Sequence, residues 1–276
     1  MASITIGQYY PENSIIHKLD PRIKLFGTLV FIVMLFMADN VISYGIITLA
    51  LAVVIKLSKV PFKKMIKGIK GIIIILIFSV GFNLFLTPGE ELVTVWVLSI
   101  TKEGLIRASY MLIRLVYLVI GTSVMTLTTT PNDLSDGLEK SFGILKYIKF
   151  PVHEMAMIIS LALRFIPTLM EETEKITKAQ KARGADFDSG GLIKKAKGLI
   201  PLLIPLFISS IRRALDLATA MEARCYHGGK RTKMKPLIYV RRDYISYVII
   251  FAYIGLVIGI NLIVKYIPIL TVLIVN

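Results

Sequence analysis

Cysteine, histidine and tryptophan are scarce in this chain of 276 residues, which has one Cys, three His and one Trp. The single cysteine, Cys225, excludes an internal disulfide, and its basic surroundings favour a compartment in which thiols stay reduced. The three histidines (His17, His153 and His227) are far apart, and none follows His153 at the spacing of a zinc protease helix. A Walker A sequence is also missing, so ATP binding through a P-loop is not expected. We therefore expect no enzyme, no metal site and no resident cofactor.

Apolar sequence, by contrast, is abundant: 55% of the residues are hydrophobic, and the mean hydropathy is +0.72. Several apolar runs approach the roughly 20 residues that a helix needs to cross a bilayer, so an all-α integral membrane protein is predicted. The formal net charge of +15 would indicate a nucleic-acid partner in a soluble chain. In a membrane protein the same charge is first compared with the positive-inside rule, which it satisfies. No nucleic-acid partner is therefore predicted.

About five membrane spans are predicted. The apolar run 23–56 is too long for one span, and Asp39-Asn40 divides it into a helical hairpin. Further spans are predicted at 71–86, at 108–127 and within 245–276. A lysine segment without acidic residues follows the hairpin: Lys56, Lys59, Lys63, Lys64, Lys67 and Lys70. It predicts a cytoplasmic loop, whereas the near-neutral connection 87–103 predicts an outside loop, so the N-terminus is expected inside and the C-terminus outside.

Residues 129–240 carry 18 Lys or Arg and 11 Asp or Glu, a density typical of a cytoplasmic domain beside a membrane. Apolar stretches at 155–169 and 198–211 are interrupted by Arg164 and by prolines. We interpret them as long amphipathic helices, kinked at proline, against the membrane face or a partner. Alternatively, either stretch enters the bilayer, which would give six or seven spans. The predicted domains are a four-helix membrane region at 1–128, a cytoplasmic coupling domain at 129–240 and a last membrane helix at 241–276.

Arg114 is the one charge deep inside an apolar run, which makes it a candidate functional residue. Alternatively, because Arg107 lies two turns earlier on the same helix face, Arg114 snorkels or pairs with a neighbouring helix. The predicted spans show neither several polar groups near the midplane nor paired broken helices, as a secondary transporter would. A self-contained secondary transporter is therefore the alternative function, and an integral-membrane enzyme is a third.

Two basic motifs, Ala182-Arg183-Gly184 and Ala223-Arg224-Cys225, lie 41 positions apart, each at the end of a predicted helix. We call residues 182–184 the first tip and residues 223–225 the second tip. An arginine at such a place interacts favourably with the negative end of the helix dipole. A single arginine of this kind could be a capping cation and nothing more. Its repetition in consecutive segments favours two cytoplasmic tips that insert into a partner.

Six motifs follow one another over more than 200 residues: HKLDPR at 17–22, TTTPNDL at 128–134, ALRFIPTL at 162–169, AQKARGAD at 179–186, RRALDLA at 212–218 and AMEARCY at 220–226. In this order they resemble the transmembrane T component of energy-coupling factor (ECF) transporters, the EcfT family. The resemblance runs nearly from end to end of the chain. It implies a multi-pass subunit of the bacterial cell membrane that belongs to an uptake complex for vitamins or related micronutrients.

The resemblance also implies partners. Two cytoplasmic ABC-type ATPases would bind ATP and grip this non-catalytic chain, which would hold a separate, membrane-embedded S component that binds the substrate. In the family, Ala-Arg-Gly motifs at the ends of two coupling helices insert into the ATPases. Position by position, these motifs correspond to Ala182, Arg183 and Gly184 and to Ala223, Arg224 and Cys225.

Cys225 departs from the family pattern, which has glycine at this position. Because cysteine disfavours a positive φ, we expect Gly228-Gly229 to end the second helix instead. Four methionines in this region could provide adaptable apolar contacts to different S components, although ordinary helix packing would use them equally well. They are Met155, Met157, Met170 and Met221.

Overall fold

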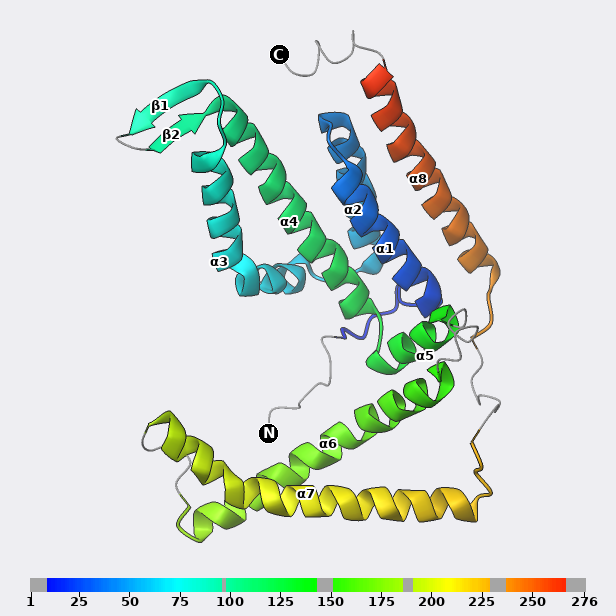
Figure 1. The fold of residues 1–276 in the computed structure, drawn as a ribbon. Helices are drawn as coiled ribbons and strands as arrows, with labels where there is room; N and C mark the ends of the chain where they lie inside the picture. The colour runs from blue at the N-terminus through cyan, green and yellow to red at the C-terminus, as the bar shows by residue number, and fades with distance from the viewer. Residues whose placement is uncertain (1–8, 96–97, 143–150, 186–190, 229–236, 267–276) are drawn as a thin grey trace. The chain divides into compact units, whose positions relative to one another are not determined.

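The computed structural model describes residues 9–95, 98–142, 151–185, 191–228 and 237–266. Apart from one two-stranded hairpin, the regular structure in these ranges is helical, so the predicted all-α class is confirmed. The chain forms two compact units, drawn in Figure 1. Among the described residues, we call the unit made of residues 9–141 and 237–266 the bundle, and the unit made of residues 142–228 the α6–α7 unit.

The bundle contains six helices and the hairpin among its described residues. They are α1 (Pro21–Met37), α2 (Val41–Ser58), α3 (Phe62–Leu86), β1 (Glu91–Val95), β2 (Leu98–Thr101), α4 (Lys102–Thr128), α5 (Pro131–Ser141) and α8 (Arg241–Tyr266). The strands pair antiparallel, from Glu91 opposite Thr101 to Val95 opposite Leu98. Valine, isoleucine and threonine are frequent in both strands, which explains why the predicted connection 87–103 has regular structure.

Side-chain caps begin several of these helices. The Asp20 carboxylate accepts a hydrogen bond from the Arg22 backbone N–H at 2.9 Å, with Pro21 at the first helical position of α1. Thr101 caps α4 through the Gly104 N–H at 3.0 Å. These caps define the first residue of each helix, whereas the hydropathy of the sequence does not change abruptly at a capping residue.

Three buried apolar clusters hold the bundle together. The first joins α2 and α3 to α4, the second closes the α1–α2 turn, and the third joins α1 to α8. Their buried members are Leu51, Val60, Met65, Ile120, Val124 and Leu127; Leu35, Ala38, Tyr44 and Ile47; and Val30, Met34 and Val257. Burial of a side chain of this size contributes about 1.5–3 kcal/mol. The core of the bundle therefore lies along α1, α2, α4 and α8.

The bundle has two distinct ends. At one end, which we call the basic end, the Lys64 ammonium lies 3.8 Å from the centre of the Tyr10 ring, and the Tyr10 N–H donates to the Leu127 carbonyl at 2.9 Å. At the other, the hairpin end, the Thr101 hydroxyl donates to the Thr87 carbonyl at 2.9 Å. The lysine segment and the 87–103 connection therefore lie at opposite ends of α3, as Figure 1 shows.

Helix α5 belongs to the bundle, whereas residues 129–141 were predicted from the sequence to belong to the cytoplasmic domain at 129–240. A Cβ atom at Gly137 would lie 2.9 Å from the Pro21 Cβ, so a glycine is needed for α5 to approach α1 this closely. The Thr130 hydroxyl accepts from the Asp133 N–H at 3.1 Å and donates to the Asp133 carboxylate at 2.7 Å, which caps α5. The TTTPNDL motif is thus a helix start, and the chain leaves the bundle after Ser141.

Five helices within the described ranges are long and apolar enough to cross a membrane. They are Val41–Ser58, Gly68–Leu86, Lys102–Thr128, Lys197–Ala223 and Arg241–Val264. Four of them belong to the bundle, and the remaining one is most of α7, so the number agrees with the prediction but the members differ. Helix α1 has 17 residues, which is about the shortest length that spans a bilayer. Its ends lie beside α8: the Asp20 N–H donates to Asp243 at 3.2 Å, and Asn261 donates to the Met37 carbonyl at 2.9 Å.

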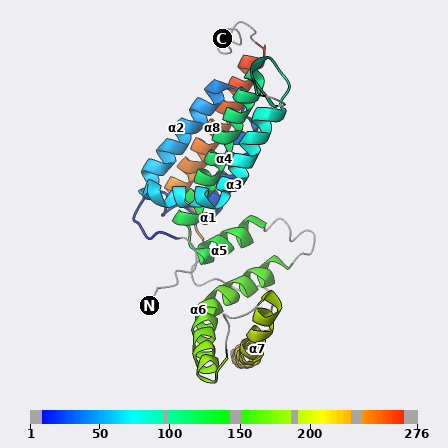
Figure 2. The same cartoon turned by 90° about the vertical axis from the view of Figure 1, so that its left-hand side faces the viewer.

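The second unit consists of α6 (Val152–Ala182) and α7 (Leu192–Ala223), which have 31 and 32 residues. Both are about twice as long as the apolar stretches 155–169 and 198–211, because the helices continue through charged sequence. Pro167 lies inside α6, and Pro201 and Pro205 lie inside α7. Figure 1 shows that α7 bends in its N-terminal half, and Figure 2 shows the two helices beside each other.

Candidate functional site

Polar contacts fix how α6 and α7 pair. The Glu172 carboxylate of α6 accepts hydrogen bonds from Ser209 and, at 2.9 Å, from the Arg213 guanidinium of α7. The hydrogen bond from Ser209, followed by the contact with Arg213, lowers the pKa of Glu172. Farther along, the Tyr226 hydroxyl contacts the Met157 sulfur at 3.3 Å. Because 172 faces 209–213 and 157 faces 226, the helices run antiparallel.

This pairing separates the two tips. The first tip ends α6, and the second tip ends α7 beside the N-terminal half of α6. By the antiparallel pairing, roughly 24 residues of helix separate the tips, or about 36 Å at the α-helical rise. One pair of antiparallel helices therefore presents two basic turns that lie far apart from each other.

The first tip is a complete helix-terminating turn. Arg183 occupies the C-cap, and Gly184 follows with a φ of +86°. The Gly184 N–H donates to the Lys181 carbonyl at 3.0 Å, and the Ala185 N–H donates to the Gln180 carbonyl at 2.9 Å. This pair of bonds is the Schellman motif, which satisfies the last carbonyls of the helix. The sequence prediction that the helix ends here is confirmed.

The second tip has the same backbone. Arg224 occupies the C-cap, and Cys225 follows with a φ of +57°. The Cys225 N–H donates to the Glu222 carbonyl at 2.8 Å, and the Tyr226 N–H donates to the Met221 carbonyl at 3.0 Å. The expectation that Gly228-Gly229 ends this helix is therefore wrong. Cysteine adopts the left-handed conformation here because two hydrogen bonds hold the turn, at a conformational cost of about 1–2 kcal/mol.

All six tip residues are exposed. Their backbone N–H groups at the turn are used within the helix, whereas the guanidinium groups of Arg183 and Arg224 are accessible. An arginine on a turn with satisfied backbone bonds can give its planar fork of donors to a carboxylate or to carbonyls of a partner. Among the residues that the structure describes, no three Cys, His, Asp or Glu gather as a metal site.

A cleft of about 400 Å³ lies between α6 and α7 beside the second tip. Met157 and Leu161 of α6 and Leu217 and Met221 of α7 form its apolar wall, and Arg164 and Arg224 contribute two cations. Arg164 belongs to the ALRFIPTL motif. From the sequence, this arginine was considered only as an interruption of an apolar stretch. The structure thus brings residues of three of the quoted motifs together at one place.

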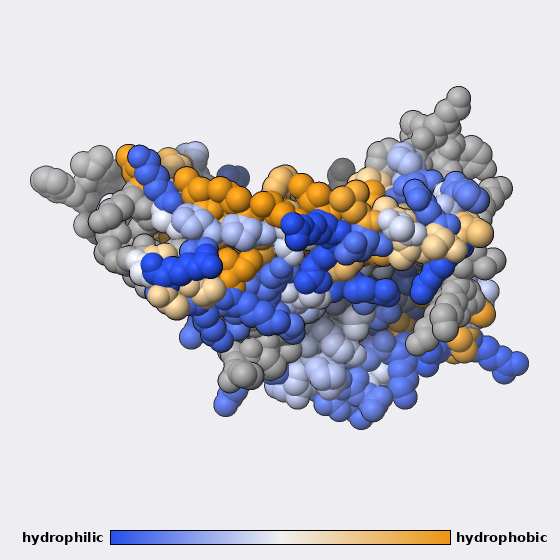
Figure 3. Space-filling model, turned by 90° about the horizontal axis from the view of Figure 1, so that it is seen from below, coloured by the Kyte–Doolittle hydropathy of each residue, from blue (hydrophilic) through white to orange (hydrophobic). Residues whose placement is uncertain are grey.

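An apolar face extends along the same unit. Leu203, Ile204 and Phe207 of α7 are 54%, 55% and 67% exposed, and Ile158 of α6 is 56% exposed. In the view of Figure 3, an apolar band is bordered by hydrophilic residues. So much exposed apolar surface is typical of a lipid or protein contact.

Arg114 lies in the bundle, away from the tip residues in the sequence and in a different unit. Its guanidinium donates to the Tyr44 hydroxyl and to the Ala38 carbonyl, both at 3.1 Å, and lies 5.5 Å from the centre of the Phe36 ring. The alternative that Arg114 pairs with neighbouring helices is confirmed, because it ties α4 to the α1–α2 turn.

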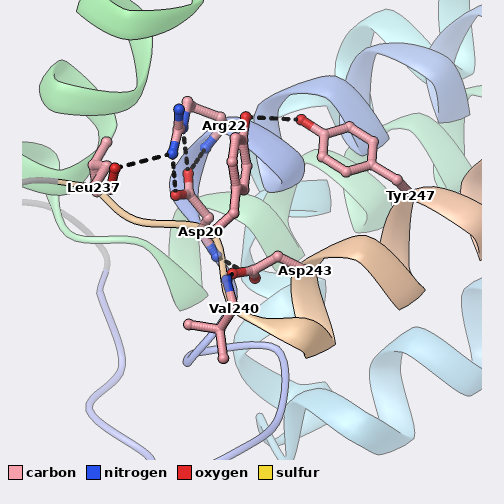
Figure 4. A network of polar contacts seen from close by, with 7 residues as sticks. Asp20, Arg22, Leu237, Val240, Asp243 and Tyr247 are labelled. Carbon is pink, nitrogen blue, oxygen red and sulfur yellow. Dashed lines mark hydrogen bonds and ion pairs between the residues drawn. The ribbon is translucent and has the colours of Figure 1, made fainter.

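A second polar network lies at the basic end of the bundle (Figure 4), and it involves residues that the sequence did not identify as a site. Arg22 donates to both oxygens of Asp20, at 3.0 and 2.8 Å, and lies 3.8 Å from the centre of the Tyr239 ring. Asp243 accepts from the Asp20 N–H at 3.2 Å and from the Val240 N–H at 2.8 Å. Asp243 lies in the first turn of α8, and an acidic residue at such a position was the sequence signal that could have indicated this network. The HKLDPR motif therefore joins the starts of α1 and α8.

His17, from the same motif, completes this end of the bundle. Its Nε2 lies 2.9 Å from the Tyr10 carbonyl and its Nδ1 lies 2.7 Å from the Ser14 hydroxyl. Because a carbonyl only accepts, Nε2 carries the proton and Nδ1 accepts from Ser14. Burial, partly offset by the hydrogen bond to Tyr10, lowers the pKa of His17. The imidazole is a neutral structural group at pH 7.

Comparisons with known proteins agree with this architecture. The family model described as CbiQ, cobalt transport protein, matches residues 12–236. Proteins named energy-coupling factor transporter transmembrane protein EcfT are similar over most of the chain. The one from Clostridium kluyveri is 52% identical over 246 residues, which cover 88% of this chain and 91% of the relative. Those from Ruminiclostridium cellulolyticum (50% over 241 residues; 87% and 90%) and Bacillus subtilis (44% over 245 residues; 88% and 92%) match similarly.

Helical architecture, membrane-length helices and these matches define an integral membrane subunit of a transporter. The chain belongs to the EcfT family and is the transmembrane T component of an energy-coupling factor transporter. The alternative of a self-contained secondary transporter is not supported by these relatives.

Proposed function

We propose that the two tips couple this chain to two cytoplasmic ATPases, with one tip inserted into each. The observation that carries the proposal is that two turns with equal backbone geometry, each presenting an arginine, stand at opposite ends of one helical hairpin. A separation of about 36 Å allows two globular partners to bind side by side without overlap. ATP would be bound by those partners, and this chain would be non-catalytic.

Coupling follows from the stiffness of the two helices, α6 and α7, about the contact that joins them. The Glu172 contacts with Ser209 and Arg213 tie the two helices together between the tips. When the ATPases approach each other on binding ATP, the two tips must move with them, and the angle between α6 and α7 changes. The cleft beside the second tip gives the helices room for this motion, because none of the described side chains fills it.

The apolar face of the α6–α7 unit is the surface that we propose for the S component. Phe207 and its apolar neighbours on α7 offer a contact that needs no particular polar partner. Met155 and Met170, 43% and 36% exposed, add flexible side chains that adapt to different surfaces. Motion of the helices would then alter the surface that the substrate-binding protein contacts. The substrates would be vitamins or related micronutrients.

Orientation is proposed from the positive-inside rule. The lysine segment lies at the basic end of the bundle, and the β1–β2 hairpin lies at the other end. The basic end, residues 9–20 and the α6–α7 unit are therefore proposed to be cytoplasmic. The C-terminal end of α8 is then outside. We propose α1, α2, α3, α4 and α8 as the spans and α7 as a surface helix, because both ends of its hairpin carry exposed arginines.

The proposed coupling is tested by pull-down of the ATPase pair with the purified full chain. Reversing the charge with Arg183→Glu or Arg224→Glu removes the cation and should weaken binding by roughly 2–5 kcal/mol per tip. The double variant should lose the ATPases altogether. Uptake in proteoliposomes should fall in parallel while the chain still inserts into the membrane.

Lys175→Glu is the matched control, because it reverses an exposed charge two turns before the first tip. It should leave ATPase binding near the wild-type level. If the double tip variant retained wild-type binding and uptake, the coupling role of the tips would be wrong. Orientation is tested separately by accessibility of a cysteine placed at Lys63 or at Glu90 in a Cys225→Ser background; labelling of both from one side would contradict it.

A further inference from the structure

We propose that the lysine segment between α2 and α3 is a binding site for anionic phospholipid headgroups. The proposal concerns a different surface from the two tips and stands independently of the coupling role. Its sequence basis is charge: between Asp39 and Glu90 the chain has no acidic residue, whereas it has six lysines from Lys56 to Lys70. Such clusters beside a membrane span attract anionic lipids.

The segment is held rigidly against the bundle. Val60 and Met65 are 5% and 0% exposed and pack in the cluster that α4 completes. Gly68 allows α3 to approach α4 closely, since a Cβ there would lie 3.1 Å from the Ser123 hydroxyl and 3.2 Å from Val119. A site for a lipid headgroup needs such fixed backbone, because a mobile lysine tail would lose more conformational entropy on binding.

The described lysine side chains are exposed, in contrast to this anchored face. The five are Lys56, Lys59, Lys63, Lys64 and Lys70. Lys59 ends α2 in the left-handed conformation, with a φ of +57°, so the chain turns sharply between the lysines of α2 and those of α3. Lysines from two helices are thereby gathered at one corner. Lys64 is already engaged with the Tyr10 ring, which leaves four described lysines for a ligand.

Position relative to the apolar sequence identifies the ligand as a lipid. The membrane-length window of α3 begins at Gly68, so Lys63 and Lys64 precede the hydrocarbon-spanning part and Lys70 lies in its first turn, at the boundary. In the turns before Gly68, Phe62 and Ile66 are 51% and 37% exposed, next to lysine. An exposed aromatic and an aliphatic side chain among cations is the pattern of a helix that lies at the headgroup boundary. A nucleic acid or an acidic protein would not favour these apolar side chains.

In the test, the detergent-solubilised full chain is titrated with short-chain phosphatidylglycerol or with short-chain phosphatidylcholine. Binding of each lipid is measured as the rise in the unfolding temperature of the chain. Each lysine near an anionic surface contributes roughly fivefold in affinity. The wild-type chain should therefore bind phosphatidylglycerol at least about tenfold more tightly than phosphatidylcholine, and added salt should reduce that ratio. Equal binding of the two lipids by the wild-type chain would overturn the proposal.

Three four-residue variants test whether the lysine segment is the source of the preference for the anionic lipid. Changing Lys56, Lys59, Lys63 and Lys70 to Gln should remove most of the preference for phosphatidylglycerol and leave at most a severalfold ratio, because Lys64 and Lys67 remain. Changing the same residues to Arg keeps the charge and should keep the preference, which separates lost binding from lost folding. Removing four exposed lysines elsewhere, at Lys140, Lys175, Lys178 and Lys197, should leave it unchanged. An equal loss in this last variant would mean that net charge, not the segment, attracts the lipid.

Free phosphate provides the remaining arm of the experiment. Inorganic phosphate at the same concentration should neither stabilise the chain nor displace phosphatidylglycerol, because it lacks the apolar chains that contact Phe62 and Ile66. Displacement by inorganic phosphate would show a simple anion site and would overturn the assignment to lipid. Phe62→Ser should weaken binding of both lipids while leaving the preference for the anionic one.

Discussion

The bundle and the α6–α7 unit use charge at helix ends in opposite ways. In the bundle, Asp20 and Asp243 are 7% and 2% exposed and accept hydrogen bonds from backbone N–H groups at the starts of two helices. In the α6–α7 unit, Arg183 and Arg224 are exposed on turns whose backbone bonds are already made. The difference indicates that charge stabilises the bundle, whereas in the other unit it is available to a partner.

The comparison predicts that the largest loss of stability comes from Asp243. Asp243→Ala leaves the Asp20 and Val240 N–H groups without an acceptor, and the buried Asp20 N–H alone costs about 1–3 kcal/mol. Thermal unfolding of the purified chain measures the effect. Asp216→Ala, which removes an exposed carboxylate of α7, should change the unfolding temperature little. A similar loss in both variants would remove the distinction between the units.

Arg114 belongs on the stability side of this comparison. Arg114→Leu removes two charge-assisted hydrogen bonds, so stability should fall by about 1.5–3 kcal/mol. Tyr44→Phe removes only one partner and should cost less. Both variants should still bind the ATPase pair in pull-downs of the folded protein. If Arg114→Leu instead abolished uptake at unchanged stability, Arg114 would have a direct role in transport.

The two tips differ from each other at one residue, and opposite substitutions should reveal it. Gly184→Ala forces a Cβ into a left-handed turn and should destabilise the α6–α7 unit by about 1–2 kcal/mol, although no atom lies within 4 Å of that Cβ. Cys225→Gly removes the same cost and should stabilise by a similar amount. Hydrogen exchange of the amides at 181–185 and 222–226 measures both. Changes of equal sign in the two variants would contradict the shared turn geometry.

The smallest expected effect is a pH dependence at His17. Because burial holds the pKa of His17 below 6.5, the unfolded chain takes up a proton more readily than the folded chain. The contribution to stability is therefore complete above pH 6.5 and is lost as pH falls from there through the folded-state pKa. Unfolding temperatures at pH 7.5 and 5.5 should differ more in the wild-type chain than in His17→Asn. The same difference in both chains would exclude His17 as the cause.

Much of the bundle could be predicted from local sequence. Asp39-Asn40 was expected to divide the first apolar run, and α1 ends at Met37 while α2 begins at Val41. The predicted span 71–86 agrees within three residues with the membrane-length part of α3, Gly68–Leu86, but the helix itself begins nine residues before the predicted span, at Phe62. The lysines before Gly71 lower the hydropathy, although Val60 and Met65 anchor this part of the chain to the core. Hydropathy measures composition and contains no information on such a buried anchor.

Contacts between distant residues could not be predicted. Asp20 and Asp243 are 223 positions apart, and Arg114 meets Tyr44 across 70 positions, so no spacing rule relates them. At the first tip the helix end followed from the sequence, but at the second tip the conformation of Cys225, and with it the helix end, did not. The preference of cysteine against a positive φ is weaker than the two backbone hydrogen bonds that the turn gains.

The native thiol of Cys225 allows the most direct test of coupling through the two tips. It is the single cysteine, and it is exposed at the left-handed position of the second tip. A photoreactive maleimide on this thiol should cross-link the full chain to an ATPase subunit in the assembled complex. Gly184→Cys combined with Cys225→Gly moves the thiol to the same position of the first tip, and it should cross-link there as well. Cross-links to lipid alone from both positions would contradict the proposed docking of the tips.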